Sequence, residues 1–536
     1  MPGDLILVNG HVMTGRLGES RPSTGIAVWH GRVAAVGSDA EVLSWRRPGI
    51  EVVDLRGRTV TPGFNDAHCH PISVGLGLQE VDARTPPNES IADVVQRIAE
   101  RARQQPPGTW IVARGYDQAR LRESRHPTRH DLDQAAPEHN VVLIRACAHI
   151  GVANSRALAL AGITATTPDP PGGTIDRDEH GEPTGVVRET ALQMVRQRVP
   201  EPSEDQIAEA LVLAGRQFLS DGVTSVAEAG IRKPEELGAY QRLARERRLP
   251  VRTTLMMMIG ETLEPLLELG VQTGLGDEWL RIGPAKLFLD GSIGGRTARM
   301  SQPYLGEPET CGLWMEEPEV MKQKLLAAHR AGFQCCAHAI GDAAIELLLD
   351  IYEEALRQHP RTDHRHRIEH CSILRPDLIE RIQRLGVVPI PGTTFLHDFQ
   401  EAYLTGLGRE RLRYAYAMRT FFDRGIIAAA STDAPVCATS AMLGIQTMVT
   451  RRNAAGHVLW PEECVSLEEA VRAYTYNGAY ATFEERVKGT IEPGKLADLT
   501  VLETDLRAVE PEALGSVRVD FTVVEGEIVY QRPGAR

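Results

Sequence analysis

Short apolar runs recur along the chain, and each is followed by a stretch with helical periodicity. This alternation predicts βα units and a parallel sheet, because parallel strands need a long crossover connection that is usually a helix. Eight candidate strands lie near residues 60–65, 223–227, 252–257, 285–289, 333–337, 366–369, 387–390 and 426–431. Eight such units predict an α/β fold of the (β/α)8 TIM barrel type.

The chain has 536 residues, more than the roughly 250 that a simple barrel needs, so additional parts are expected. Residues 1–58 and 488–536 are rich in short β-type runs. Because isolated hairpins are marginal in water, we expect the two ends to pair into one composite β-sandwich domain. The barrel domain then spans residues 59–487. The interval between its first two strands is too long for one helix, which predicts an α/β insertion at residues 72–215.

Charge and hydropathy limit the expected partners. The 59 Lys and Arg residues are outnumbered by 72 Asp and Glu residues, and no basic run is present, which argues against nucleic acid and favours a small-molecule substrate. The first apolar run is too short for a signal peptide, and no stretch is long enough to span a bilayer. We therefore expect a cytoplasmic protein without a membrane partner. Dimers are common among enzymes of this kind, so a homodimer is a possible assembly.

Histidine and aspartate residues stand at the carboxyl ends of several candidate strands, where barrel enzymes assemble their sites. His68 and His70 follow the first strand, and a spacing of two puts both imidazoles on one side of an extended chain. His338 ends the fifth strand, His370 the sixth and Asp433 the eighth. Each residue alone could be a hydrogen-bonded core residue or a helix cap. Their joint placement instead favours a metal site in which Asp433 also carries a proton.

A His-x-His pair is weak evidence without this context, because a second pair exists. His364 and His366 precede the sixth candidate strand, which places them at the opposite, structural edge of a barrel. We interpret these two histidines as solvated surface residues.

Lys286 lies inside the apolar run AKLFLD, where an ammonium group is costly to desolvate. Burial lowers the pKa of a lysine, and a neutral amine can react with carbon dioxide to form a carbamate. A carbamate between two cations is an anionic bridge that offsets their repulsion. The alternative is a salt bridge with Asp290. We favour the carbamate because the histidines and Asp433 already indicate a metal nearby.

The segments PGFNDAHCHP, KLFLDGSIGGRTA, AHAIGD, IEHC and STDAP, in this order, resemble the amidohydrolase superfamily, specifically its YtcJ-like amidohydrolase 3 family. The similarity extends to the closing YNGAYATFEERVKGTIEPGKLADLTVLE and into the insertion. The resemblance implies one or two zinc ions held by a common set of ligands, namely His68, His70, His338, His370, Asp433 and, in a binuclear site, N6-carboxylated Lys286.

Family members include N-substituted formamide deformylases, so the resemblance implies a metal-dependent hydrolase that cleaves a non-peptide C–N bond with activated water. Candidate substrate-binding residues are His149, from the insertion, and Asp290 and Arg296, from the loop after the fourth strand. A structural role for His149 stays open. The alternatives are a deaminase or cyclic-amide hydrolase on the same site, a metal-dependent isomerase, and a barrel that has lost catalysis and only binds.

Overall fold

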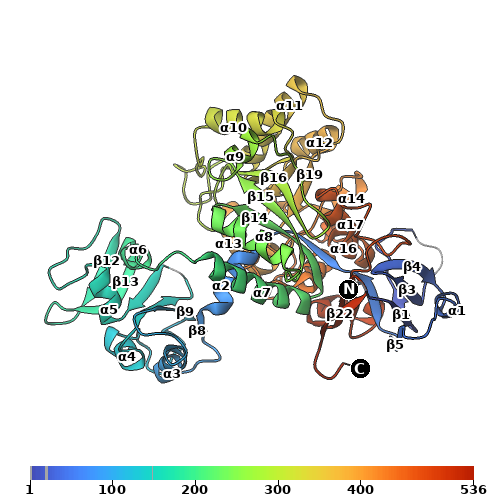
Figure 1. Ribbon diagram of the computed structural model, residues 1–536. Coiled ribbons are helices and arrows are strands. Elements are labelled where there is room, and N and C mark those ends of the chain that lie inside the picture. Colours follow the sequence, from blue (N-terminus) through green and yellow to red (C-terminus); the bar gives the residue numbers. More distant parts are fainter. Residues whose placement is uncertain (1–2, 19–21, 148, 536) are drawn as a thin grey trace. The chain divides into compact units, whose positions relative to one another are not determined.

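The computed structural model describes residues 3–18, 22–147 and 149–535, and the chain divides into two compact units (Figure 1). The first unit comprises Met1–Val74 and Leu211–Arg536, and the second comprises Gly75–Ala210. The boundaries of the second unit fall within the expected insertion at residues 72–215.

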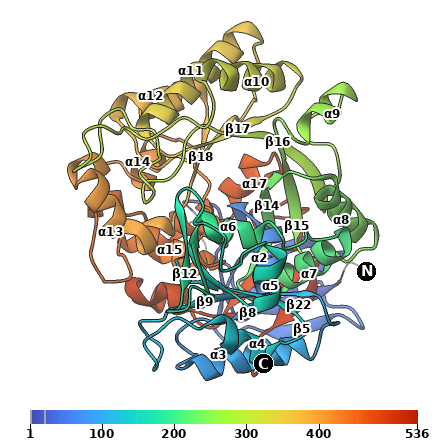
Figure 2. The ribbon, with the colours of Figure 1, turned by 90° about the vertical axis from the view of Figure 1, so that its left-hand side faces the viewer.

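A parallel sheet of seven strands forms the centre of the first unit, in the order β19-β18-β17-β16-β15-β14-β7. Its strands are β7 (Phe64–Cys69), β14 (Val223–Ile231), β15 (Arg252–Met258), β16 (Leu280–Phe288), β17 (Cys335–Ala339), β18 (Arg367–His370) and β19 (Val388–Pro391). The sheet is barrel-like, and helices lie outside it, as α10 to α12 do beside β16 to β18 (Figure 2). The parallel sheet that the sequence pattern predicted is confirmed, with seven of the eight expected strands.

The sequence explains where the helices that connect or follow these strands begin and end, and which face they bury. In α12, for example, the apolar side chains of Leu378, Ile379 and Ile382 are buried, and the helix begins at Pro376 and ends before Gly386, which has a φ of 69°. The α-helices of at least six residues that lie wholly in the first unit are α8 (Pro234–Arg245), α9 (Leu263–Glu268), α10 (Pro318–Arg330), α11 (Asp342–Gln358), α12 (Pro376–Leu385), α13 (Phe395–Leu407), α14 (Met418–Asp423), α15 (Ala441–Thr450), α16 (Leu467–Ala473) and α17 (Tyr476–Ala481).

The expected eighth strand, residues 426–431, is not a regular strand, but its backbone hydrogen-bonds both edges of the sheet. On one side Ala429 N–H donates to Pro389 O at 3.0 Å, and on the other Ala67 N–H donates to Ala430 O at 3.2 Å. Two of the four residues of β19 are prolines, Pro389 and Pro391, which accept hydrogen bonds but have no N–H to donate. The ladder at this seam is therefore incomplete, and the sheet is nearly closed.

The predicted first strand, residues 60–65, is two strands that belong to different sheets. β6 (Thr59–Pro62) pairs with strands of the chain ends, whereas β7 (Phe64–Cys69) starts the central sheet. Gly63 separates them, and a Cβ atom there would collide with the side chain of Thr224. Because β7 begins later than predicted, His68 lies within the strand and only His70 follows it.

Strands from both ends of the chain share one five-stranded sheet, ordered β2-β6-β20-β21-β22. A four-stranded sheet, ordered β4-β3-β1-β5, is built from the first part of the chain alone. Side chains of both sheets, among them Leu7 and Ile26 with Leu499 and Val523, belong to one buried apolar cluster, and Figure 1 shows β1, β3 and β4 near β22. The remaining strands are β1 (Leu5–Val8), β2 (His11–Val12), β3 (Gly25–Trp29), β4 (Arg32–Gly37), β5 (Glu51–Asp54), β20 (Leu499–Leu502), β21 (Val519–Val524) and β22 (Glu527–Gln531).

The second unit contains a six-stranded sheet, ordered β12-β13-β11-β10-β9-β8. Side chains of its central strand β10 alternate between two buried clusters, with Val141 and Leu143 in one and Val142 and Ile144 in the other. Both faces of this sheet are therefore covered. The elements are β8 (Val81–Asp82), β9 (Trp110–Tyr116), β10 (Asn140–Arg145), β11 (Ile150–Ala153), β12 (Gly173–Arg177), β13 (Pro183–Glu189), α3 (Ile91–Ala102), α4 (Arg129–Ala135), α5 (Ser155–Leu160) and α6 (Thr190–Arg196).

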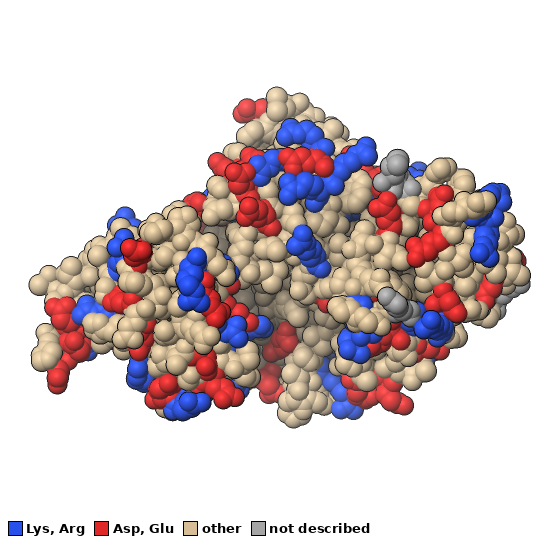
Figure 3. Space-filling model, turned by 60° about the horizontal axis from the view of Figure 1, so that its bottom comes forward, with Lys and Arg blue, Asp and Glu red and all other residues tan. Residues whose placement is uncertain are grey.

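The surface carries charges of both signs. On the face drawn in Figure 3, Lys and Arg side chains lie beside Asp and Glu side chains rather than in a large area of one sign. Within the part of the chain that the structure describes, no helix combines the length and apolar character needed to cross a membrane.

Candidate metal centre

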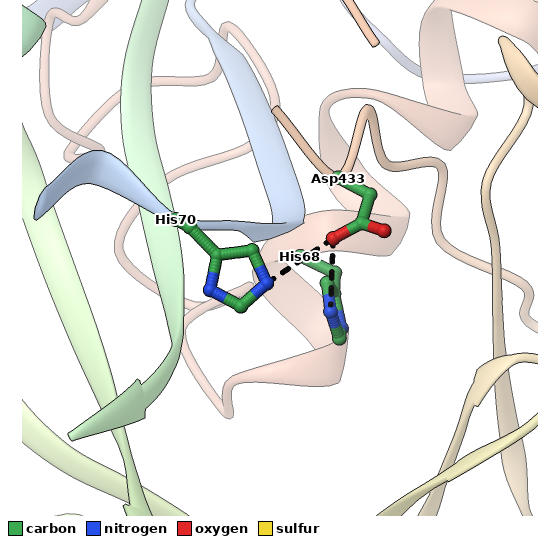
Figure 4. A group of neighbouring side chains, drawn as sticks. All are labelled: His68, His70 and Asp433. Carbon is green, nitrogen blue, oxygen red and sulfur yellow. Dashed lines mark ion pairs between the residues drawn. The ribbon is translucent and has the colours of Figure 1, made fainter. Parts of the chain in front are cut away.

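His68, His70 and Asp433 meet at the carboxyl end of β7. Asp433 Oδ1 lies 3.5 Å from His68 Nε2 and 3.3 Å from His70 Nε2. Figure 4 shows the two imidazoles, which come from β7 and the residue after it, directed at this carboxylate. One nitrogen or oxygen atom from each of the three residues lies within 4.8 Å of the others, which is close enough for all three to bind one metal ion.

Backbone hydrogen bonds place Asp433 between the two histidines. Asp433 N–H donates to His68 O, and His70 N–H donates to Ala434 O, both at 2.8 Å. Asp433 has a φ of 57° and His370 a φ of 66°, the left-handed region that non-glycine residues rarely adopt. Such strain of about 1–3 kcal/mol per residue clusters at functional sites, where the surrounding structure maintains it.

The other two predicted histidines join the same cluster. The imidazole centroids of His338 and His370 are 4.5 Å apart, and those of His68 and His370 are 4.7 Å apart. His338 belongs to β17 and His370 ends β18. The structure thus brings together the four histidines and the aspartate that the sequence placed at strand ends.

Buried carboxylates contact the Nδ1 atoms of three of these histidines. The pairs are His68 with Glu369, His70 with Glu228 at 3.6 Å, and His338 with Asp290 at 3.0 Å. A carboxylate on one ring nitrogen fixes the orientation of a histidine and leaves Nε2 for a metal ion. Sequence reasoning missed Glu228 and Glu369, although Glu228 lies near the end of β14 and Glu369 is adjacent to His370.

Lys286 is fully buried on β16, and its Nζ atom has no hydrogen-bond partner among the described residues. The amine lies 4.8 Å from the centre of the Phe288 ring. Burial lowers the pKa of Lys286, which increases the fraction of neutral amine. The alternative salt bridge with Asp290 is not formed within the described chain, because both carboxylate oxygens of Asp290 bind other donors.

The protonation states suit a cation site. Burial keeps the pKa values of His68 and His370 well below the usual value, so both imidazoles are neutral and can donate a lone pair. Burial also disfavours charge on His70, but the carboxylates of Asp433 and Glu228 outweigh it and raise its pKa to about 9. A metal ion would displace that proton, because metal binding requires a deprotonated ring.

Among the buried side-chain atoms that lack a hydrogen-bond partner in the described part of the chain, three belong to the predicted ligands, namely Lys286 Nζ, His370 Nδ1 and Asp433 Oδ1. Unpartnered buried polar atoms are rare in folded proteins and often mark an ion or water. Imidazole nitrogen and carboxylate oxygen are the donors that zinc accepts. The residues present therefore fit a zinc centre.

The three residues that were predicted to contact the substrate, Asp290, Arg296 and His149, lie in surroundings that differ from one another. Asp290 is buried and bonded to protein donors, so its position indicates support of His338 rather than contact with substrate. Arg296 lies with its guanidinium 5.3 Å from the centre of the Tyr304 ring. His149 belongs to the second unit, where its largely exposed ring contacts Glu189 at 3.0 Å.

The interpretation of His364 and His366 as solvated residues is wrong. His364 is 5% exposed and His366 is fully buried. They precede β18, as predicted, but their rings bond to other protein groups. His366 Nε2 lies 2.9 Å from His329 Nδ1, and His364 Nε2 donates to Leu385 O at 2.8 Å. Because HRHR is a run of four polar residues, the sequence did not indicate that these histidines belong to a buried hydrogen-bonded cluster.

Known proteins resemble this chain over most of its length. The model of the amidohydrolase family matches residues 51–530. The chain belongs to the amidohydrolase family. It is 33% identical to the N-substituted formamide deformylase of Arthrobacter pascens, over 99% of both chains. It is 32% identical to the YtcJ protein of Bacillus subtilis (strain 168), over 90% of this chain and 91% of the other.

The fold of this amidohydrolase is also similar to that of solved structures. An uncharacterized metal-dependent hydrolase from Pyrococcus furiosus aligns with a TM-score of 0.77 and 31% identity. The alignment covers 95% of this chain and all of that one.

Proposed function

We propose that this amidohydrolase is a metal-dependent hydrolase that cleaves a non-peptide C–N bond, of the amide or formamide type, in a small molecule. The observation that carries the proposal is the position of Asp433 Oδ1, 3.5 and 3.3 Å from the Nε2 atoms of His68 and His70. The similarity to a formamide deformylase over nearly the whole chain supports the choice of bond.

The proposed centre takes one or two zinc ions at the carboxyl end of a (β/α)8-type barrel, in which the irregular segment 426–431 occupies the place of the eighth strand. The residues that would hold them are His68, His70, His338, His370, Asp433 and carboxylated Lys286. The buried, unpartnered amine of Lys286 supports the last assignment. Zinc in such a site supplies Lewis acidity toward a carbonyl oxygen and lowers the pKa of water to about 7.

Asp433 is the proposed proton carrier. Its carboxylate accepts a proton from the attacking water and delivers it to the leaving nitrogen, which departs as a neutral amine. Glu369 and Glu228 hold the rings of His68 and His70, so that the Nε2 atoms face the centre. Because reacting groups must be held in place before the reaction, these supports contribute to the rate without touching the substrate.

The proposal is tested by elemental analysis of the purified protein and by a screen of N-formyl amines, N-acyl amines and carbamates, with and without a chelator. We expect bound zinc and release of an amine from at least one class, lost on chelation and restored by zinc. Metal-free protein that retains full turnover would overturn the metal mechanism. A metal-loaded protein that cleaves none of these classes but deaminates or isomerises a substrate would overturn the choice of bond.

A further inference from the structure

Asp290 is fully engaged by protein donors. Its Oδ1 atom lies 3.0 Å from His338 Nδ1 and accepts the Ile340 N–H at 3.1 Å. Its Oδ2 atom accepts the N–H groups of Gly341 and Arg299, each at 2.9 Å. The residue as a whole is 1% exposed. These four donors use the acceptor positions of the carboxylate, so none is left in good geometry for a substrate. Asp290 therefore binds protein groups rather than substrate.

The contact determines which nitrogen of His338 carries the proton. A carboxylate flanked by a ring nitrogen accepts its hydrogen, so Nδ1 of His338 is the protonated atom and Nε2 keeps its lone pair. The ring of His338 lies 4.5 Å from that of His370, inside the proposed metal centre. Asp290 therefore fixes both the tautomer and the direction of the ring.

Asp290 also joins three segments. It follows β16, its Oδ1 partner Ile340 follows β17, and Arg299 belongs to the long loop between β16 and α10. The backbone N–H groups hold the carboxylate from two sides. The ring that it supports thus depends on the position of the loop as well as on the sheet.

We propose that Asp290 is a positioning residue that sets His338 for metal binding and couples it to the loop of residues 291–301. This inference rests on the proposed zinc centre and replaces the substrate contact that the sequence suggested. Loss of such a support weakens metal affinity by about 10- to 100-fold in comparable sites.

Asp342 offers a matched control. It is likewise buried, accepts the backbone N–H of Ser301 in the same loop at 2.8 Å, and also binds the hydroxyl of Ser301 and the guanidinium of Arg375. None of these partners is a histidine. A variant at Asp342 therefore loosens the loop without releasing His338.

The test compares Asp290→Asn with Asp342→Asn by the zinc affinity of the folded full-length proteins, measured by competition with a chromophoric chelator. An asparagine at position 290 places its NH2 group against N–H donors whichever way it turns, so one pair of bonds is lost. We expect zinc affinity to fall by about 10- to 100-fold in Asp290→Asn and to stay at the parent value in Asp342→Asn.

A double-mutant cycle separates action through His338 from general loosening. If Asp290 acts through the ring, adding Asp290→Asn to His338→Ala causes no further loss of zinc affinity. Asp290→Glu, which keeps both acceptor oxygens, is the second variant if the asparagine variant does not fold, and it should lose less affinity than Asp290→Ala.

Unchanged zinc affinity in the position-290 variants, an equal loss in Asp342→Asn, or additive effects in the cycle would each overturn this inference. A parent protein that binds no zinc would instead refute the proposed function. The two failures are therefore distinguishable in the same titration.

Discussion

His68 Nδ1 is hydrogen-bonded to the carboxylate of Glu369, although the two residues are 301 positions apart in the chain. Glu369 also accepts two hydrogen bonds from Arg367, at 2.7 and 2.9 Å, and the side chains of Arg367 and Glu369 are fully buried. A predicted ligand on β7 is thus held by a charged pair on β18. This arrangement makes the candidate metal centre and the stability of the sheet dependent on the same carboxylate.

Replacing Glu369 with Gln should therefore be costly. The change leaves the buried guanidinium of Arg367 without its counter-charge, and breaking a buried pair in this way costs about 3–5 kcal/mol. We expect a large loss in the free energy of unfolding of the metal-free protein, measured with urea. Glu353→Gln is the control, because Glu353 pairs with Arg384 at a half-exposed site and such pairs contribute about 0–1 kcal/mol. Equal losses in the two variants would contradict the argument.

Replacing Asp433 with Asn removes the proposed proton carrier and keeps an oxygen at the same position. We expect kcat to fall by about 100- to 10,000-fold, the usual contribution of a general acid or base. Zinc content, measured by elemental analysis, should stay largely intact because the histidines remain. Retained turnover would remove Asp433 as the proton carrier.

Much of this centre could be predicted from the sequence, because parallel strands bring their carboxyl ends to one edge. The grouping of His338 and His370 with His68 was predicted in this way. Glu369 was missed for a physical reason: adjacent strand residues point to opposite faces, so a residue beside a predicted ligand is expected to point away. The left-handed backbone of His370, with a φ of 66°, breaks that alternation, and nothing in the residue type of a histidine predicts it.

The fold was predicted least well where local sequence and tertiary context disagree. Residues 60–65 were predicted as one strand, but Gly63 divides them between β6 and β7, which belong to two sheets. His364 and His366 looked hydrophilic, yet each ring nitrogen that faces the interior finds a hydrogen-bond partner. Burial of a polar residue depends on partners distant in sequence, which local patterns do not reveal.

Lys286→Met should separate stability from metal binding. The variant removes a buried amine that has no hydrogen-bond partner among the described residues, and leaving such a group unpaired costs about 1–3 kcal/mol. We expect the metal-free variant to unfold at the same or a higher temperature than the parent, while the number of zinc ions bound and kcat fall.

Lys488→Met is the control for burial alone. Lys488 is also buried, but its Nζ atom binds Glu484 at 2.9 Å and Ser225 at 3.0 Å. This variant should lower the unfolding temperature of the metal-free protein, because it leaves Glu484 buried without its cation. A Lys286→Met variant that is destabilised as strongly as Lys488→Met would show that Lys286 has a structural partner.

The buried histidine cluster before β18 makes stability dependent on pH. His366 Nδ1 accepts the Cys335 N–H at 3.0 Å, so its Nε2 carries the proton that His329 Nδ1 accepts. His329 Nε2 in turn lies 2.8 Å from the His359 carbonyl oxygen. In this series of hydrogen bonds, each of the two imidazole rings is neutral, with one nitrogen as donor and the other as acceptor. Burial lowers the pKa values of His366 and His329 in the folded protein.

In the unfolded chain these histidines titrate near their ordinary pKa of about 6.5. Because the folded pKa values are lower, the stabilising contribution is complete above pH 6.5 and is lost as the pH falls below it. For His366, whose pKa burial holds well below its ordinary value, the loss approaches about 1.4 kcal/mol per pH unit. His366→Gln removes one titrating ring, so its stability should be lower at pH 8 but should decline less steeply with acid. Urea unfolding of the parent and variant between pH 8 and 5 measures both slopes, and identical slopes would rule out His366 as a source of acid sensitivity.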